Sequence, residues 1–276
     1  MSSEASPNRS EHDVDERVVG SRVVEADSEL RRMMKDDDAS ALDRYMALVV
    51  GRRSLRALLW YELRMLLLSG IPGGLGIALR RKLYQGMFQE CGRNVVIGRN
   101  VVIRHPHRIS LGDNVIIDDN AVLDAKGNQK VAIRIGPHSI IGRNTILSCK
   151  QMTDQSGTIE LAERVNISVN CTLISESRLE IGTKVLLAGH VYVIAGGNHG
   201  TERTDIPILD QPMVHKGGVS IGDHCWIGAN VTVLDGVMIG RDAMIAAGAV
   251  VRESVDAFTI VGGVPARLLR DRRTPS

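Results

Sequence analysis

Residues 217–251 read GGVSIGDHCWIGANVTVLDGVMIGRDAMIAAGAVV, and an aliphatic side chain returns at every sixth position. These positions are Ile221, Ile227, Val233, Ile239, Ile245 and Val251. A helix repeats its faces every 3.6 residues and a strand every two. A strict spacing of six residues therefore indicates short straight segments joined by tight turns. Three such segments make one triangular coil of eighteen residues. The stretch therefore predicts a parallel β-helix.

The same spacing runs back to Ile97. Fourteen earlier positions fit it, namely Ile97, Ile103, Leu111, Ile117, Leu123, Ile135, Ile141, Leu147, Leu161, Ile167, Leu173, Ile181, Leu187 and Val193. Short additions near residues 109, 129, 153 and 179 interrupt the register. At the inter-strand spacing of roughly 4.8 Å, about seven coils form a prism on the order of 35 Å long. We expect an all-β fold with this β-helix over 91–256 and a C-terminal cap and basic tail over 257–276.

Composition agrees with a thin, repetitive core. The chain is 43% hydrophobic but only 3% aromatic, and it holds 28 glycines, so Val, Ile, Leu and Ala must fill the interior between tight turns. No basic patch is interleaved with aromatic residues, which argues against a nucleic-acid partner. The cysteines lack C-x-x-C spacing and the first thirty residues lack a signal peptide, which predicts a cytoplasmic protein with buried thiols at Cys91, Cys149, Cys171 and Cys225.

The repeat has one long interruption, the loop 196–220. It begins AGGNHGTERTDIPILDQP (195–212), and His199 stands where the next aliphatic residue is due. Binding and catalytic residues concentrate on loops that a rigid scaffold positions. This loop is therefore the first place to look for chemistry.

Two further segments precede the repeat. Residues 1–40 carry eleven acidic and six basic side chains, and 1–35 is too polar to form a core, which predicts a disordered acidic tail. A helical segment is expected over 36–90, with helices in SALDRYMALVV, SLRALLWYELRMLLL and GIALRRKLYQGMF. Ser40 and Ser54 are candidate N-caps, and a break is expected near Gly51.

The helical segment admits two interpretations. Residues 41–90 carry eight basic and three acidic side chains, and Arg53, Arg56, Trp60 and Arg64 share one face of the second helix while leucines cover most of the rest. The helices either pack on the body of the protein or lie on the inner face of a membrane. Crossing the membrane is disfavoured by the internal charges and by the Pro72 break.

The residues from GGVSIGDHCWIGANVTVLDGVMIGRDAMIAAGAVVRESV to IVGGVPARLLR resemble the hexapeptide-repeat acetyltransferases, the group of maltose, galactoside and xenobiotic O-acetyltransferases. The similarity covers roughly 91–270. RHPHRISLGDNVIIDDN and GRNTILSCK look closer to bacterial polysaccharide O-acetyltransferases. The resemblance implies a left-handed helix, a homotrimer, and acetyl-CoA meeting a sugar or glycan acceptor in a cleft between subunits.

The resemblance also implies a catalytic residue. In the family a histidine at the start of the long loop is the general base, and GGNHG places His199 there. Neutral imidazole is basic enough near pH 7 to accept a hydroxyl proton. The alternative is a solvated loop histidine. We expect the other histidines on the surface, with His190 as the first exception; they are His12, His105, His107, His138, His190, His215 and His224.

Acceptor and donor residues follow by the same comparison. Glu176 matches a sugar-binding carboxylate, although a solvated turn residue is equally compatible, while Asp205 and Gln211 either bind the acceptor or brace the loop. For the donor, Ala229 and Ala247 match small residues along the pantetheine arm and Trp226 matches a tryptophan near the thioester. Basic residues near the CoA phosphates are matched by Arg252, Arg267 and Arg270, although Arg252 replaces the usual threonine.

Two other functions remain open. A carbonic-anhydrase-like metal lyase shares this type of fold but needs three histidines around a metal, and His190, His199 and His224 lack the close pairing that this requires, so no metal is expected. A non-catalytic scaffold is the second alternative.

Overall fold

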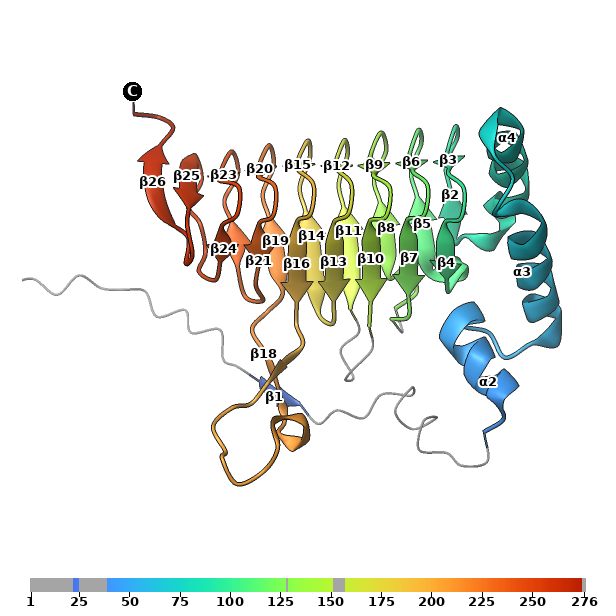
Figure 1. Ribbon diagram of the computed structural model, residues 1–276, viewed down its shortest axis with the longest axis horizontal. Coiled ribbons are helices and arrows are strands. Elements are labelled where there is room, and N and C mark those ends of the chain that lie inside the picture. The colour runs from blue at the N-terminus through green and yellow to red at the C-terminus, as the bar shows by residue number, and fades with distance from the viewer. Residues whose placement is uncertain (1–21, 25–38, 128, 151–156, 275–276) are drawn as a thin grey trace, which may run out of the picture.

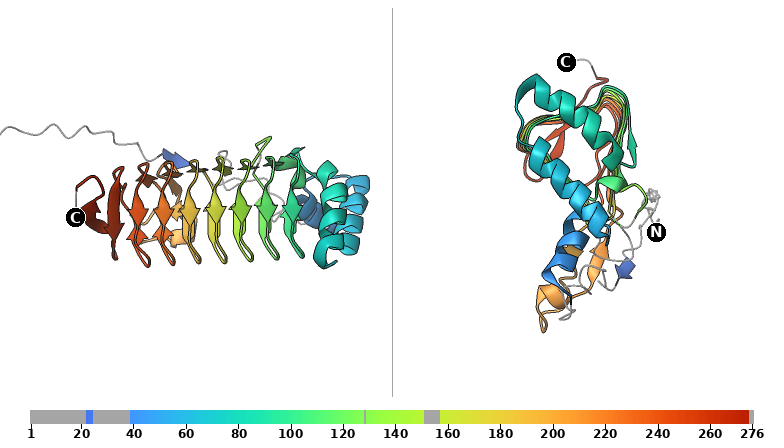
Figure 2. Two further views of the ribbon diagram at one scale, coloured as in Figure 1. Left: turned by 90° about the horizontal axis from the view of Figure 1, so that it is seen from above. Right: turned by 90° about the vertical axis from the view of Figure 1, so that its right-hand side faces the viewer.

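The computed structural model describes residues 22–24, 39–127, 129–150 and 157–274. Figure 1 shows a long solenoid of parallel coils with helices at its N-terminal end and one large excursion from its side. The predicted β-helix is therefore confirmed. Figure 2 shows α3 (Leu55–Leu68) and α4 (Gly73–Tyr84) lying across the end of the solenoid.

Three parallel sheets form the faces of the solenoid. The first contains β2 (Glu90–Cys91), β5 (Ile109–Leu111), β8 (Ile133–Ile135), β11 (Thr158–Leu161), β14 (Arg178–Ile181), β19 (Val219–Ile221) and β22 (Met238–Ile239). The second contains β4 (Val102–Arg104), β7 (Val122–Ala125), β10 (Ile146–Cys149), β13 (Thr172–Ser175), β16 (Tyr192–Ala195), β21 (Thr232–Val233) and β24 (Val250–Val251). The third contains β3 (Val96–Ile97), β6 (Ile116–Ile117), β9 (Ile140–Ile141), β12 (Asn166–Ile167), β15 (Leu186–Leu187), β20 (Trp226–Ile227), β23 (Met244–Ile245), β25 (Thr259–Gly262) and β26 (Arg267–Asp271). Only the last pair, β25 and β26, is antiparallel within these sheets.

The six-residue repeat fixes the register of the coils. Leu147 lies in register with Leu123 in one neighbouring coil and with Leu173 in the other, so like side chains stack into rows. All twenty predicted inward positions are at most 2% exposed. The core of the molecule is therefore one continuous column of stacked aliphatic side chains.

Tight turns between the strands depend on two residue types. Asparagines adopt the left-handed conformation at several corners, and the Asn144 Nδ2 donates a 2.9 Å hydrogen bond to Asn170 Oδ1 in the next coil. Coils also approach closely at glycines, since a Cβ at Gly136 would lie 2.3 Å from the Ala162 carbonyl oxygen. Asparagine adopts the left-handed conformation readily, although His138, Arg164 and Lys184 adopt it here too, and glycine is required where the next coil leaves no room for a Cβ.

The helical segment is close to its prediction. It contains α2 (Ala41–Tyr45), the π-helical turn η1 (Met46–Val50), α3, α4 and the short η2 (Gln85–Met87). The Ser40 side chain caps α2 by accepting a hydrogen bond from the Asp43 amide, whereas the Ser54 side chain makes no such bond to α3. The third helix begins three residues earlier than expected, at Gly73, because the break ends with the extended Pro72.

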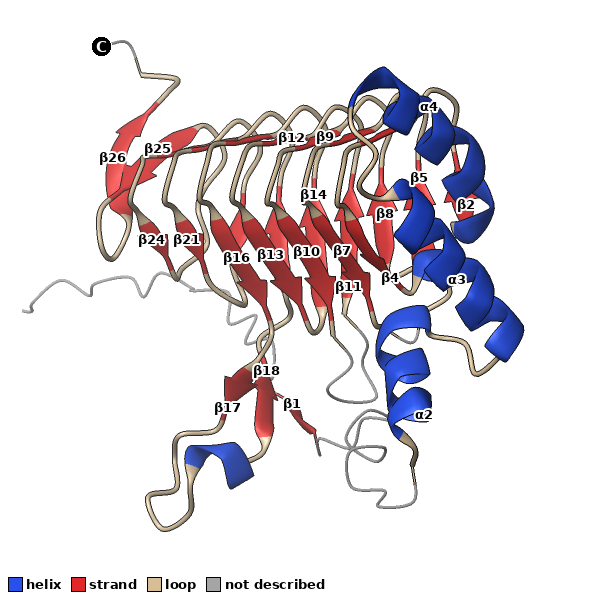
Figure 3. Ribbon diagram, turned by 45° about the vertical axis from the view of Figure 1, so that its right-hand side comes forward, coloured by secondary structure: helices blue, strands red, loops and turns tan. Residues whose placement is uncertain are grey.

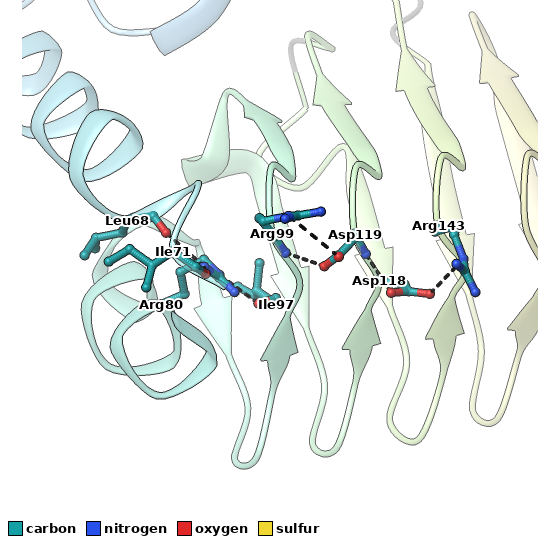
Figure 4. Close-up of polar contacts among 8 residues, drawn as sticks. All are labelled: Leu68, Ile71, Arg80, Ile97, Arg99, Asp118, Asp119 and Arg143. Carbon is teal, nitrogen blue, oxygen red and sulfur yellow. Dashed lines mark hydrogen bonds and ion pairs between the residues drawn. The ribbon is translucent and has the colours of Figure 1, made fainter. Parts of the chain in front are cut away.

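The helices dock on the first coil through buried polar contacts (Figure 4). The Arg80 guanidinium, 2% exposed, donates from Nε to the Ile97 carbonyl at 2.9 Å and from Nη1 to the Leu68 and Ile71 carbonyls at 2.9 and 2.8 Å. Burial lowers the pKa of Arg80. Tyr61 also donates its hydroxyl to the Ile103 carbonyl at 2.9 Å. One face of the helical segment thus packs on the body of the protein.

Figure 4 also shows ion pairs that link turns of neighbouring coils. The Arg99 amide donates to Asp119 Oδ1 at 2.6 Å, and the Arg143 guanidinium lies 3.9 Å from Asp118 Oδ2. These side chains are 41–66% exposed, so each pair contributes little to stability.

Two expectations about the rest of the chain need correction. Within the predicted disordered tail, β1 (Arg22–Val24) pairs antiparallel with β18 (Met213–His215), and the remainder of 1–35 lies outside the described residues. Two histidines expected on the surface, His105 and His215, are only 6 and 7% exposed. His105 lies beneath the α2–α3 connection and His215 within the excursion, so both are covered by segments that do not follow the repeat. Within the described part of the chain, no helix is long and apolar enough to cross a membrane.

Candidate active site

The long excursion leaves the solenoid through glycines and returns through glycines. Gly196 and Gly197, directly after β16, have φ values of 113° and 80°, and Gly217 and Gly218, directly before β19, have values of 100° and 88°. Residues other than glycine rarely adopt these backbone φ values. The excursion is not a simple loop, because it contains an antiparallel hairpin and the short helix η4 (Ile208–Asp210).

The hairpin joins β17 (Asn198–His199) to β18. Asn198 lies opposite Val214 and His199 lies opposite Met213. Figure 3 shows this hairpin projecting from the side of the solenoid below β16. The backbone pairing gives His199 a fixed position that a mobile loop would not provide.

Asp235, which the sequence analysis did not single out, holds both ends of the excursion. Its carboxylate is 6% exposed and accepts a 2.7 Å hydrogen bond from the Asn198 side-chain amide. At the returning end, the backbone amides of Gly218 and Lys216 donate to it at 3.0 and 3.2 Å. The only signal in the sequence is an acidic residue inside the otherwise apolar VTVLDGV. One buried carboxylate therefore clamps the chain at its exit and its return.

His199 is partly buried, and its Nδ1 atom is shielded from solvent without a hydrogen-bond partner among the described residues. Successive residues of a strand point to opposite faces. Since Asn198 points to Asp235, the imidazole of His199 points to the other face of the hairpin. The backbone pairing thus holds the ring, while its Nδ1 is shielded from solvent and has no hydrogen-bond partner among the described residues.

Glu176 lies where the chain leaves the solenoid. Its side chain is buried, with Oε1 3.3 Å from Lys150 Nζ and with Oε2 unpaired within the described part of the chain. A Cβ at Gly197 would lie 3.4 Å from Oε2, so the carboxylate lies against the backbone two residues before His199. This burial contradicts the interpretation of Glu176 as a solvated turn residue. Lys150, its cationic partner, was also not predicted.

The two candidate residues inside the excursion differ in their surroundings. Gln211 is 5% exposed; its Oε1 accepts from the Arg203 amide at 3.2 Å and its Nε2 donates to the Arg203 carbonyl at 2.7 Å. Asp205 is exposed and pairs with the Arg203 guanidinium. Gln211 therefore braces the loop in this structure.

The small residues expected along the donor lie in adjacent coils. Gly248 donates its amide to the Ala229 carbonyl at 2.8 Å, and a Cβ at Gly228 would lie 2.6 Å from the Ala247 nitrogen. Trp226 lies on β20 with its side chain outward and 48% exposed. The two turns and the outward tryptophan thus belong to the same end of the solenoid.

Two of the three arginines expected near the phosphates share an acidic partner. The Arg252 Nε lies 3.3 Å from Glu253 Oε1, and the Arg267 Nη1 lies 3.5 Å from Glu253 Oε2. Arg270 is exposed on β26, opposite Ile260. The structure therefore brings Arg252 and Arg267 together through Glu253.

Three of the four cysteine thiols lie in the hydrophobic core of the solenoid. Cys149, Cys171 and Cys225 are free and buried, as expected, and burial raises the pKa of the Cys225 thiol to about 11; Cys91 is partly buried. In the described ranges, no three His, Cys, Asp or Glu side chains are grouped so that they could hold a metal ion. His190 and His224 are exposed at left-handed turns.

A solenoid of six-residue repeats with a histidine-bearing excursion defines a hexapeptide-repeat protein. Residues 218–253 match the family model of the bacterial transferase hexapeptide (six repeats), and residues 91–125 match the hexapeptide repeat of succinyl-transferase. These two matches show hexapeptide repeats near both ends of the solenoid, and the relatives below support the resemblance to the hexapeptide-repeat acetyltransferases. The resemblance seen in the sequence is thereby confirmed.

Curated relatives from Escherichia coli K12 include two acetyltransferases. A putative lipopolysaccharide biosynthesis O-acetyl transferase is 32% identical over 41% of this chain and 61% of its own length. Galactoside O-acetyltransferase is 26% identical over 48% of this chain and 63% of its own length. The chain thus spans less than two thirds of these relatives. A solved N-acyltransferase from Bacillus cereus, in complex with dTDP and 3-hydroxybutyryl-CoA, is 29% identical over 70% of this chain and 88% of its own, with a TM-score of 0.47.

Proposed function

We propose that the protein is an O-acetyltransferase that moves an acetyl group from acetyl-CoA to a hydroxyl of a sugar or polysaccharide precursor. The observation that carries the proposal is the position of His199. Its ring is held by a clamped hairpin at the exit of the solenoid, and Nδ1 has no partner in the described structure. The names of the two Escherichia coli relatives support this type of reaction.

His199 acts as the general base in this proposal. The neutral imidazole accepts the proton of the acceptor hydroxyl while the hydroxyl oxygen attacks the thioester carbonyl carbon of acetyl-CoA. A carbon–oxygen bond forms and the carbon–sulfur bond then breaks. The imidazolium returns the proton to the departing thiolate of CoA, so the ring is neutral again after each turnover.

The remaining candidate residues, apart from Gln211, bind the two substrates. The unpaired Oε2 of Glu176 accepts a hydrogen bond from a hydroxyl of the acceptor. Asp205, which is exposed on the excursion, also binds the acceptor. The backbone at Ala229 and Ala247 borders the pantetheine arm beside Trp226. Arg252, Arg267 and Arg270 bind the phosphates of CoA, because guanidinium groups match phosphate geometry.

The proposal includes assembly and location. We propose a homotrimer in which the donor and acceptor meet between neighbouring subunits, and a cytoplasmic protein that contacts the inner face of the membrane through 41–90. Light scattering during size-exclusion chromatography tests the trimer. A monomer at the concentrations used for activity would contradict it.

The proposed activity is tested by transfer of labelled acetyl from acetyl-CoA to a panel of glycan acceptors, with mass spectrometry of the products. We expect one class of glycan to gain one or more acetyl esters and free CoA to appear in equal amount. A protein that neither binds acetyl-CoA in calorimetry nor acetylates any acceptor would contradict the proposal.

A further inference from the structure

The outer face of α3 is an exposed row of leucines. Five of them are 48–81% exposed: Leu55, Leu59, Leu63, Leu66 and Leu67. Their spacing of three, four, seven and eight residues places them on one face of the helix. The inner face is formed by Leu58, Tyr61 and Leu68, which are buried on the first coil. Figure 3 shows no described element over the outer face of α3. A contiguous exposed apolar patch of this kind indicates a binding surface.

A cationic pocket of about 530 Å³ borders the leucine row. Its lining includes Arg52, Arg56, Arg64 and His107, together with the indole of Trp60. No acidic side chain belongs to the described residues that line it. The pocket therefore offers several hydrogen-bond donors with positive charge and no local counter-charge.

Two kinds of arginine line this pocket. Arg64 is fixed, because its Nε donates to the Leu83 carbonyl at 2.9 Å and its guanidinium lies 5.1 Å from the centre of the Trp60 ring. Arg52 and Arg56 are exposed and form no ion pair with acidic residues in the part of the chain that the structure describes. Burial first, and then the charge of Arg52, lower the pKa of His107 to about 4, so the imidazole is neutral at neutral pH.

We infer that α3 and the adjoining pocket form a docking surface for an anionic phospholipid membrane. The headgroup phosphate binds Arg52 and Arg56 in the pocket, and the leucine row enters the boundary between headgroups and acyl chains. Leucines beside arginines form the pattern of helices that lie in the membrane interface. Phosphate matches the fork of guanidinium donors, and each basic residue near an anionic surface adds about 1 kcal/mol to binding.

This inference rests on the membrane contact proposed above and specifies its residues and its lipid. The excursion and α2 project from the same side of the solenoid (Figures 1 and 2). Docking through the helical end therefore fixes the direction in which the excursion points relative to the membrane. The mode of docking does not depend on His199, so the two proposals can fail separately.

Co-sedimentation with vesicles tests the inference. The full-length protein is mixed with phosphatidylglycerol or phosphatidylcholine vesicles, and we expect much tighter binding to the anionic ones. Arg52→Ala and Arg56→Ala should each weaken that binding about fivefold, which is ~1 kcal/mol per arginine. The double variant Leu59→Ser/Leu66→Ser should weaken it at least tenfold.

Matched controls change similar residues elsewhere. Arg143→Ala removes an exposed arginine from a coil turn, and Leu209→Ser removes a leucine that is 70% exposed on the excursion. Both should bind phosphatidylglycerol vesicles like the unchanged protein. Equal binding to both vesicle types, or full binding by the Arg52 and Arg56 variants, would overturn the inference.

Two soluble probes separate a membrane surface from a simple anion site. Inorganic phosphate and a short-chain phosphatidylglycerol below its micelle concentration are titrated into the protein by calorimetry. We expect far weaker binding than to vesicles, because neither probe offers an acyl region to the leucine row. Tight phosphate binding without vesicle binding would overturn the inference. His199→Asn should bind vesicles normally, and Arg52→Ala should still acetylate a soluble acceptor.

Discussion

At the scale of single residues, the carboxylate of Asp235 determines where His199 lies. It is buried and accepts three hydrogen bonds, one from Asn198 at the exit of the excursion and two from backbone amides at its return. Hydrogen bonds to a charged acceptor are worth roughly 1.5–3 kcal/mol each, and removal of the acceptor leaves buried donors unpaired. The effect on His199 is indirect, since Asp235 positions the hairpin.

Asp235→Ala should lower kcat for acetyl transfer on the order of a hundredfold, because a shift of about 1 Å in a catalytic group has that effect. The KM for acetyl-CoA should change little, since the candidate donor residues lie on other turns. Steady-state kinetics measures both constants. Asp210→Ala, an exposed position of the same excursion, is the matched control and should retain activity. A rise in KM with an unchanged kcat would contradict the positioning role.

At the scale of elements, the joint between the helical segment and the first coils depends on His105. Its Nε2 lies 2.8 Å from the Ala47 carbonyl oxygen, which can only accept, so Nε2 carries the proton. Its Nδ1 is buried without a partner in the described structure. A second proton would therefore place a charge in a buried position, and the nearby Asp124 carboxylate offsets only part of that cost. Burial accordingly lowers the pKa of His105 to about 4.

The helical segment should therefore loosen in acid. A lowered pKa means that the unfolded state binds the proton more tightly than the folded state. The contribution of His105 to the free energy of unfolding is therefore fully present above pH 6.5 and is lost as the pH falls to about 4. The shift of the His105 pKa corresponds to a loss of about 3 kcal/mol in the free energy of unfolding. Urea unfolding followed by Trp60 fluorescence, in a Trp226→Phe background, measures it. His105→Asn, which tolerates the left-handed backbone, should remove about half of the pH dependence, because burial also lowers the pKa of the neighbouring His107 to about 4. If the free energy of unfolding depended equally on pH in the unchanged protein and in His105→Asn, His105 would not be the cause.

At the scale of the whole molecule, stability resides in rows of stacked aliphatic side chains. Leu173 is completely buried and lies in register between Leu147 and Val193. In a solenoid each coil contacts mainly its neighbours, so a cavity in a central coil weakens two interfaces at once. The excursion and the helices rely on this column as their rigid support.

Leu173→Ala should reduce the free energy of unfolding by about 2–5 kcal/mol, the usual range for a large cavity in a packed core. Urea unfolding followed by circular dichroism measures the loss. Thr172→Ala changes the outward-pointing neighbour on the same strand and should change stability far less. Similar losses in the two variants would mean that the inward row is not the main source of stability.

The periodic part of the fold was predictable from the sequence, and the parts between segments were not. The inward rows followed from spacing alone, and the place of His199 followed from the resemblance. Asp235 was missed because its contact with Asn198 exists only once the excursion closes. The burial of His105 was missed because it depends on the docking of helices from outside the repeat. Contacts made by segments outside the repeat have no periodic sequence pattern from which they could be predicted.

The role of His199 as general base is tested most directly by kcat/KM for acetyl transfer in His199→Asn and in His190→Asn. Both substitutions replace an imidazole with the same amide, and His190 is exposed at a left-handed turn that asparagine also adopts. We expect kcat/KM of His199→Asn to fall 10²- to 10⁴-fold while the variant still binds acetyl-CoA, and kcat/KM of His190→Asn to stay close to that of the unchanged protein. Activity of His199→Asn within a few-fold of the unchanged protein would contradict the role of His199 as general base.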